Sequence, residues 1–386
     1  MSDLPVSAAE PIFVGAQIYR ASSYGSKHPL AIPRVPSVTE LGRALGWLPP
    51  SRYRSSPRAK PAALRPFHTA EYIAALQAAE HSQQVSDTVR ARHGLGTLSN
   101  PIHPHMFRRP ATSVGGVLFG AAQIANGGVA YVPGGGTHHG MPDRANGFCY
   151  LNDPVLAIKA LQRQGLNRIA YVDIDAHHCD GVEAAFHGEE TVRLISVHEE
   201  KRWPFTGALA DTAGGSAFNL PVPRNLNDTE FELILERFLL PAVDHFRPDA
   251  VVLQCGADAL LEDPLARLAL SNTSHWKTVA ALRELSRRFL VLGGGGYNPW
   301  SVARCWTGVW ATLCGIEIPD ELPGAARRIL ENLTWNRRAG FLPPTHWYTS
   351  LRDDPRHGEI RDDVRDRVQH LRNRLSAEAA APTLSA

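Results

Sequence analysis

The most informative stretch of the sequence is Arg168-Ile-Ala-Tyr-Val-Asp-Ile174, which runs directly into Asp175-Ala-His-His-Cys-Asp-Gly181. The first part is an apolar, β-branched run that is typical of a buried strand. Three carboxylates and two imidazoles fall at its end, and packing alone cannot explain them because buried unpaired charges are very costly. Side chains two residues apart on an extended chain point the same way. Asp175 and His177 therefore form half of a predicted metal site.

Similar runs elsewhere predict the rest of a sheet. With residues 168–174, the candidate strands are residues 129–132, 192–198, 250–254 and 289–292. Their mostly continuous hydrophobicity is typical of parallel strands that are buried on both faces. Asn152-Asp153-Pro154 predicts the start of a helix between the first two strands, because Asn caps helices and Pro suits their first turn. We expect an α/β fold with a mostly parallel central sheet flanked by helices.

The flanking regions are less regular in sequence. Before residue 128 we expect one helix at about 69–84 and Pro-rich loops, and after residue 318 irregular segments followed by a charged helix at about 362–375. No internal repeat or clear linker is present, which favours a single domain over residues 1–386.

Composition narrows the functional classes. The 386 residues are 44% hydrophobic and 20% charged, and 40 basic against 38 acidic side chains leave a formal net charge of +2. This balance does not favour a nucleic-acid partner, which would more often select a basic excess. The five cysteines are odd in number and include no Cys-x-x-Cys pair, so a disulfide framework is not expected. Without an apolar signal segment or a membrane-length apolar stretch, we expect a cytoplasmic protein and no membrane partner.

A third metal ligand is predicted from another strand end. Zinc in a hydrolase takes about three protein ligands and keeps an open position for water. Asp258, in Gln254-Cys-Gly-Ala-Asp258, joins Asp175 and His177 if the loops that follow the strands converge at one edge of the sheet. An isolated Asp-x-His would more often be a capping Asp and a packed His, but the second loop favours the metal site.

Two adjacent histidines, His138 and His139, lie in the glycine-rich run Gly134-Gly-Gly-Thr-His-His-Gly140. Zinc lowers the pKa of a water that it binds to roughly 7, and hydrolysis then needs a proton acceptor and a proton donor. The histidines can fill these roles if carboxylates hold them in different protonation states, and Asp173 and Asp180 are the candidates. Away from a metal loop, such a pair would more often be incidental.

Tyr297 follows four glycines in Gly293-Gly-Gly-Gly-Tyr-Asn-Pro. A phenol on such an open loop can donate a hydrogen bond to an oxyanion as a carbonyl becomes tetrahedral. The phosphate-loop alternative lacks the Gly-Lys-Ser/Thr ending. A water-activating metal, paired histidines and an oxyanion donor together indicate amide hydrolysis.

These motifs resemble the zinc-dependent histone deacetylase superfamily, including its acetoin-utilization-type and acetylpolyamine amidohydrolase-like bacterial members. The resemblance covers about residues 19–318, which leaves a C-terminal extension of about 319–386. It rests on Gly-Gly-Gly-Thr-His-His-Gly, Asn146-Gly-Phe-Cys-Tyr-Leu-Asn-Asp153, Asp-Ile-Asp-Ala-His-His-Cys-Asp-Gly, Cys-Gly-Ala-Asp and Gly-Gly-Gly-Tyr. It implies an arginase/deacetylase-like fold with the active site at the C-terminal ends of the strands.

The resemblance also implies a role for each motif residue. One Zn²⁺ per chain would be held by Asp175, His177 and Asp258. His139 would be the principal acid/base and His138 its electrostatic partner, oriented by Asp180 and Asp173 respectively, with Tyr297 polarising the acyl carbonyl.

Further positions carry over as substrate and ion contacts. The acyl tunnel would be formed by Gly147, Phe148, Trp203 and Gly295. The family often binds a monovalent cation, here K⁺, which would involve Asp173, Asp175, His177, Ser196 and Val197. Arg34 resembles an arginine beside an internal cavity through which acetate leaves.

Three positions depart from the family pattern. Ser99-Asn100-Pro101 stands where many relatives carry an Asp before the Pro of a rim loop that holds a peptide backbone, which favours small substrates over proteins. Cys179 replaces the usual glycine, and we expect the loop to tolerate it if its φ is negative. Trp203 is bulkier than the usual aromatic and narrows or reshapes the tunnel.

The favoured hypothesis is a zinc-dependent deacetylase that acts on ε-acetyl-lysine or on small acetylated amines such as acetylpolyamines. A binuclear Mn²⁺ ureohydrolase of the arginase type stays open as an alternative, although its second metal loop usually carries Asp-x-Asp, whereas here Asp263 lies five residues beyond Asp258. A non-catalytic acyl-lysine-binding module is the other alternative. A homo-oligomer is compatible with the sequence.

Overall fold

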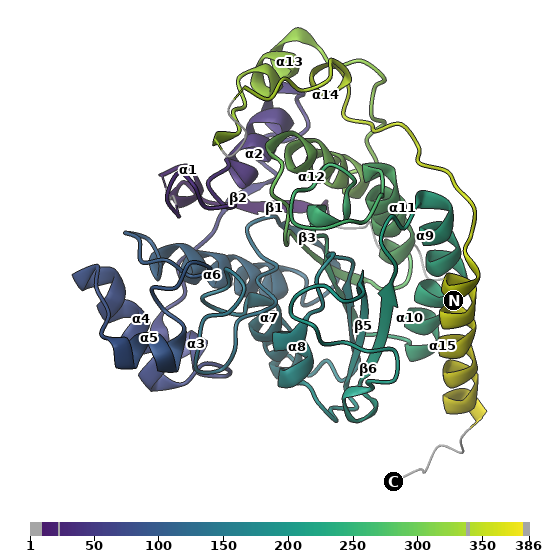
Figure 1. Cartoon of the computed structure of the whole chain (residues 1–386), viewed down its shortest axis with the longest axis horizontal. Coiled ribbons are helices and arrows are strands. Elements are labelled where there is room, and N and C mark those ends of the chain that lie inside the picture. Colours follow the sequence, from purple (N-terminus) through teal and green to yellow (C-terminus); the bar gives the residue numbers. More distant parts are fainter. Residues whose placement is uncertain (1–9, 22–23, 337–339, 381–386) are drawn as a thin grey trace.

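One eight-stranded sheet forms the centre of the computed structural model, which describes residues 10–21, 24–336 and 340–380 (Figure 1). The strand order is β2-β1-β3-β8-β7-β4-β5-β6, and every pair of neighbours runs parallel. The strands are β1 (Ile12–Gly15), β2 (Tyr53–Ser55), β3 (Gly128–Val132), β4 (Ile169–Asp173), β5 (Val192–Glu199), β6 (Ala217–Val222), β7 (Ala250–Gln254) and β8 (Arg288–Leu292). The predicted fold class, an α/β protein with a parallel central sheet, is confirmed.

The five predicted strands are confirmed with ends that agree within one residue, and they are β3, β4, β5, β7 and β8. Three strands at the margins of the sheet were not predicted. The strands β1 and β2 are short, and β2 is only half-buried. The edge strand β6 contains Asn219 and Pro221, which are disfavoured within strands, although an edge position tolerates proline.

Helices cover both faces of the sheet, as continuous hydrophobicity of the central strands requires (Figure 1). One face packs against α6 (Arg108–Gln123), α7 (Asp153–Arg163) and α8 (Asp180–Ala185). The other face packs against α2 (Arg34–Ala44), α9 (Asp228–Ile234), α10 (Leu240–Phe246), α11 (Asn272–Arg283), α12 (Pro299–Leu313) and α15 (Asp362–Ala380). The remaining helices are α1 (Ile18–Ala21), α3 (Pro61–Leu64), α4 (Ala70–Ser82), α5 (Asp87–His93), α13 (Gly324–Glu331) and α14 (His346–Thr349).

The helix predictions succeeded where capping signals were strong. The side chain of Asn152 accepts a hydrogen bond from the N–H of Val155 and so caps α7 as expected. The long helix α6 was not predicted, since Pro110 and several glycines lower its helix propensity. Close packing explains one of these glycines, because a Cβ on Gly115 would lie 1.9 Å from the carbonyl oxygen of Pro57. The helix α13 was also missed within a segment that was predicted to be irregular.

The sheet order brings the chemically active loops together. The strands β3, β8, β7 and β4 are consecutive neighbours, so the loops at their carboxyl ends open at one edge of the sheet. Ligands of open α/β sheets bind at this edge. Among the described residues, no helix has the length and apolar character needed to cross a membrane.

The C-terminal segment is held to this framework by a buried ion pair. The guanidinium of Arg304 on α12 lies 2.7 Å from Asp353 Oδ1, and both side chains are almost fully buried. Arg304 Nε and Nη2 also donate to the carbonyl oxygens of Ser350 and Arg352. The substitution Arg304→Met leaves the buried Asp353 carboxylate with only Arg356 Nη1, 3.9 Å from its Oδ2, as a neighbouring cation, so we expect the free energy of unfolding to fall by about 3 kcal/mol.

Urea denaturation measures this loss. The control is Lys277→Met, which breaks the exposed pair between Lys277 and Glu232 and should cost no more than about 1 kcal/mol. Equal losses in the two variants would show that the Arg304–Asp353 pair does not stabilise the fold.

Candidate active site

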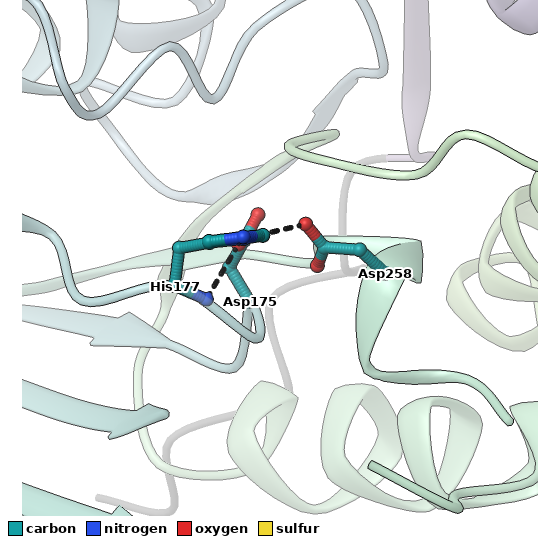
Figure 2. A group of neighbouring side chains, drawn as sticks. All are labelled: Asp175, His177 and Asp258. Carbon is teal, nitrogen blue, oxygen red and sulfur yellow. Dashed lines mark hydrogen bonds and ion pairs between the residues drawn. The ribbon is translucent and has the colours of Figure 1, made fainter. Parts of the chain in front are cut away.

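Three side chains of the kinds that can bind a metal meet at the carboxyl ends of two neighbouring strands. Asp175 and His177 lie in the loop after β4, and Asp258 lies in the short 3-10 helix Ala257–Ala259 that follows β7 (Figure 2). His177 Nδ1 is 3.1 Å from Asp175 Oδ1 and 3.0 Å from Asp258 Oδ2. All three residues are buried, and they are the only group of three or more such ligands found within the described part of the chain.

Backbone and amide donors orient the two carboxylates of this group. Asp175 Oδ2 accepts from the N–H of Gly295 at 2.7 Å and from Gln254 Nε2 at 2.9 Å. Asp258 Oδ1 accepts from the N–H of Ala176 at 3.0 Å. The other oxygen of each carboxylate is thereby turned toward His177 Nδ1. Two oxygens and one nitrogen, each with a fixed orientation, form a donor set that fits Zn²⁺.

The charge balance of the group also favours a cation. Burial and the neighbouring charge of Asp175 raise the pKa of Asp258. Burial alone would lower the pKa of His177, but its hydrogen bonds to Asp175 and Asp258 raise it to about 10. Two buried carboxylates thus stabilise positive charge between them, and a divalent ion would supply that charge.

Glycines leave room for this arrangement. A Cβ on Gly256 would lie 2.2 Å from Asp175 Oδ2, and one on Gly295 would lie 2.0 Å from Asp258 Oδ2. Gly295 was predicted to contact substrate, and the structure gives it a second task beside the metal ligands. Asp263, by contrast, accepts from the N–H groups of Leu265 and Tyr297 and is not part of the ligand group.

Each of the two adjacent histidines pairs with its own carboxylate. His138 Nδ1 lies 2.8 Å from Asp173 Oδ2, and His139 Nδ1 lies 2.6 Å from Asp180 Oδ1. The two imidazole centroids are 4.0 Å apart. A carboxylate at Nδ1 favours a proton on that nitrogen and leaves Nε2 to exchange protons.

The environments of the two histidines differ. Burial alone would lower the pKa of His138, but the charges of Asp173 and Asp175 raise it to about 9. Burial and the neighbouring charge of His138 lower the pKa of His139 to about 4 despite the contact with Asp180. At neutral pH, His138 is therefore cationic and His139 neutral, which is the division that an electrostatic partner and a proton acceptor require.

Two residues that were predicted to begin a helix also hold the histidine loop. Asn152 Nδ2 donates to the carbonyl oxygens of His138 at 3.1 Å and Gly140 at 2.9 Å. Asp153 accepts from the N–H of Gly136 at 2.7 Å and from Ser113 Oγ at 3.0 Å. Sequence reasoning quoted both residues in a helix start and in a family motif but missed this role, because neither pattern relates them to the histidine loop.

His68 supports Asn152 and makes the fold sensitive to acid. His68 Nδ1 donates to the carbonyl oxygen of Met141, and Nε2 accepts from the N–H of Asn152, each at 3.0 Å. Burial lowers the pKa of His68 to about 4. The unfolded chain takes up a proton at an ordinary pKa of about 6.5, so folding stability falls as the pH decreases from about 6.5 to about 4. We expect the titration of His68 to lower the free energy of unfolding by about 3 kcal/mol over this pH range.

The substitution His68→Asn removes the titrating group, so the free energy of unfolding of the variant should fall less steeply over this pH range. Urea denaturation of chelator-treated protein measures the slope without interference from metal release. His81→Asn, at an exposed position of α4, is the control and should keep the wild-type slope. Parallel pH profiles for His68→Asn and the wild type would contradict the assignment.

Tyr297 lies beside this group after β8. Its N–H donates to Asp263 Oδ2 at 2.7 Å, and its ring is 5.8 Å from that of Phe148. Burial and the charges of Asp258 and Asp175 hold its pKa well above the ordinary value. The phenol therefore stays protonated and can act as a hydrogen-bond donor.

Two aromatic side chains lie beside the histidines and Tyr297. The indole of Trp203 lies 4.6 Å from the ring of His139 and 6.4 Å from that of His177, between centroids. Phe148 lies on the side of Tyr297, and its φ of 69° is unusual for a bulky residue. A Cβ on Gly147 would lie 2.2 Å from the Trp203 ring, so this glycine admits the larger indole.

The remaining predicted positions are distributed around this centre. Arg34 lines the same cavity as His138 and Tyr297, and its Nη1 donates to the carbonyl oxygen of Gly294 at 2.5 Å. Asp173 and Ser196, expected to contact K⁺, face each other in the β4–β5 register, and Ser196 Oγ contacts His198 Nδ1.

The structure also places two residues that depart from the family pattern, Cys179 and Ser99. Cys179 has a φ of −82°, which meets the condition set for replacing glycine. Ser99 is exposed, and its carbonyl oxygen contacts His28 Nε2.

Comparison with known protein families gives a clear match. The model of the histone deacetylase domain matches residues 28–313. Two relatives are histone deacetylase 19 of Arabidopsis thaliana and histone deacetylase 1 of Homo sapiens. Each is 34% identical to this chain over an aligned region that covers 78% of it. The matches span 61% and 64% of those two proteins, less than two thirds of their length. Histone deacetylase 9 of Arabidopsis thaliana is 29% identical, with 90% of this chain and 92% of that protein covered.

Solved structures match over nearly the whole chain. A histone deacetylase homologue complexed with SAHA superimposes with a TM-score of 0.89 at 35% sequence identity. A homologue from Aquifex aeolicus gives a TM-score of 0.89 at 34% identity. Each comparison covers 94% of this chain and 100% of the other.

Proposed function

The chain belongs to the histone deacetylase family, and we propose on this basis that it is a zinc-dependent deacetylase that hydrolyses the amide of acetylated amines. The observation that carries the proposal is the proximity of one three-residue metal-ligand group to two histidine–aspartate pairs in a buried site. Amide hydrolysis needs both, because water must be activated and the amine must be protonated as it leaves.

Asp175, His177 and Asp258 would hold the zinc ion. When bound, zinc would supply a Lewis acid that activates water and polarises the acyl carbonyl. His139, neutral and held at Nδ1 by Asp180, accepts the proton of the attacking water at Nε2 and passes it to the departing amine. His138 keeps its positive charge, which stabilises the negative charge that develops nearby. Tyr297 donates its phenolic hydrogen to the developing oxyanion.

The aromatic side chains restrict what reaches this machinery. Trp203 covers the side of His139, and Phe148 covers the side of Tyr297. A slender chain with an acetamide at its end fits between such walls. The exposed rim residue Ser99 carries no charge to bind a peptide backbone, so we favour small acetylated amines such as acetylpolyamines over acetyl-lysine proteins.

A turnover panel tests the function. Metal-loaded protein is incubated with acetyl-lysine peptides and acetylpolyamines, and acetate and free amine are quantified separately. We expect equal amounts of both products, faster turnover of the small amines, and inhibition by SAHA, the ligand of a solved homologue. Chelator-treated protein is the control and should release neither product. Absence of turnover on all substrates, together with no binding of SAHA, would rule out the deacetylase.

Two further assignments belong to this proposal. A K⁺ ion would contact Asp173, Asp175, His177, Ser196 and Val197, and turnover in K⁺ compared with a tetramethylammonium salt of equal ionic strength tests it. Arg34 would face acetate as it leaves through the cavity that it shares with Tyr297.

A further inference from the structure

A cavity of about 50 Å³ continues from the candidate active site into the protein. His138, His139 and Tyr297 line its reactive end, and two arginines, Arg34 and Arg109, also line it. The arginines come from different parts of the fold, because Arg34 begins α2 and Arg109 lies in the first turn of α6. Two guanidinium groups in one internal cavity make it strongly cationic, so the cavity favours an anion.

Arg34 is only partly satisfied by the protein. Its Nη1 donates to the carbonyl oxygen of Gly294, and its guanidinium lies 5.3 Å from the ring centroid of Trp306. Its buried Nε has no hydrogen-bond partner among the described residues. Burial and the nearby charge of Arg109 lower the pKa of Arg34. An anion in the cavity would relieve both the missing hydrogen bond and the repulsion.

Arg109 adds the second charge at the same place. Its side chain is buried, and its guanidinium lies 5.6 Å from the ring centroid of Tyr19 and 5.2 Å from that of Tyr24. Both tyrosines line the cavity.

The path from the reactive centre to Arg34 is lined by glycines. Arg34 binds the carbonyl oxygen of Gly294, and the next residue, Gly295, donates its N–H to the metal ligand Asp175. A Cβ on Gly136 would lie 2.6 Å from the nitrogen of Gly294, so these two segments pass each other without side chains between them. An acyl chain that extends beyond the acetyl methyl would therefore run toward the arginines.

We propose that the Arg34–Arg109 cavity binds the terminal carboxylate of an ω-carboxyacyl group, so that the enzyme hydrolyses amides such as succinyl-lysine or succinylated amines. Guanidinium groups bind carboxylates through charge-assisted hydrogen bonds. Water adds its hydroxyl to the amide carbonyl, the C–N bond breaks, and the amine takes the proton, which yields a dicarboxylate and a free amine. This inference rests on the proposed amidase function and specifies its acyl substrate.

Peptides that carry succinyl-lysine or butyryl-lysine test whether a terminal carboxylate on the acyl group favours hydrolysis, because the two acyl chains have the same length. A peptide that carries acetyl-lysine is the reference. We expect kcat/KM for the succinyl peptide to exceed that for the butyryl peptide by about 10- to 100-fold, which is the range of charge-assisted hydrogen bonds. Arg109→Met should reduce this ratio by a similar factor, and Arg109→Lys should restore part of it. Arg163→Met, at an exposed position of α7, is the control and should leave the ratio unchanged.

Calorimetric titration of succinate and butyrate gives a second readout that does not depend on turnover. Metal-loaded protein should bind succinate more tightly than butyrate, and Arg109→Met should remove the difference. Arg109→Gln is a second variant if Arg109→Met does not fold. Hydrolysis of acetyl peptides without any preference for succinyl over butyryl, in turnover or in binding, would overturn this inference and leave the deacetylase proposal intact.

Failure of every acyl peptide and of the acetylpolyamines would instead count against the amidase function. In that case the titration still decides the cavity ligand, because equal affinities for succinate and butyrate would overturn the carboxylate site.

Discussion

Asp258→Asn is expected to lower amide hydrolysis by at least about 1000-fold and to reduce the zinc content of the protein after dialysis. The substitution keeps the shape of the side chain, but it removes one of two buried carboxylate charges that face His177. An amide oxygen is a weaker zinc ligand than a carboxylate, and the remaining charge of Asp175 is insufficient to replace it. Metal analysis and acetate release, measured on the same preparation, test both parts of the prediction.

The control for this experiment is Asp244→Asn, which makes the same chemical change at an exposed position of α10. It should retain full zinc content and turnover. If Asp258→Asn kept both as well, Asp258 would not be a metal ligand. If it lost turnover but kept its zinc, the carboxylate would act on the reaction by another route.

Tyr297→Phe is expected to lower kcat by about 100- to 1000-fold while zinc content and KM change little. The variant keeps the ring that packs against Phe148 and the backbone N–H that donates to Asp263. It loses only the phenolic hydroxyl, whose hydrogen is needed when negative charge develops on the acyl oxygen and not before. The prediction is therefore a selective loss in kcat, measured by initial rates across a range of substrate concentrations.

Tyr348→Phe is the matched control for Tyr297→Phe. Tyr348 lies on α14 and packs against the hydrophobic core, away from the candidate active site. Its substitution should leave kcat unchanged. A wild-type kcat for Tyr297→Phe would remove Tyr297 from the proposed mechanism, and a loss of zinc would indicate a structural role instead.

The parts of the fold that could be predicted are those with strong local signals. The strands β4 and β7 are fully buried and mostly apolar up to the polar residue that ends each of them, and Asn152 with Pro154 marks the start of α7. The edge strand β6 and the helix α6 carry residues that oppose their own secondary structure, and only tertiary packing accounts for them. Gly115 is an example, since its contact with Pro57 joins segments that no local pattern relates.

In the candidate site, too, some residues could be predicted from local sequence signals and others are brought in only by the tertiary structure. Asp175, His177 and Asp258 were identified from motifs at strand ends, because parallel strands bring their carboxyl ends to one edge of the sheet. Asn152 was noted as a helix cap and as part of a family motif, but neither pattern showed that its side chain binds the histidine loop. Arg109 lies in a helix that was not predicted, so its place beside Arg34 could not be inferred from the sequence.

The sequence by itself determined which residues can bind a metal, move a proton and donate to an oxyanion, because these abilities belong to side-chain chemistry and to spacing along a strand. Only the tertiary structure decided how adjacent residues differ. His138 faces two carboxylates and is cationic, whereas His139 faces one carboxylate and a neighbouring cation and is neutral. Electrostatic interactions depend on burial and on distances in space, and segments far apart in the chain set both.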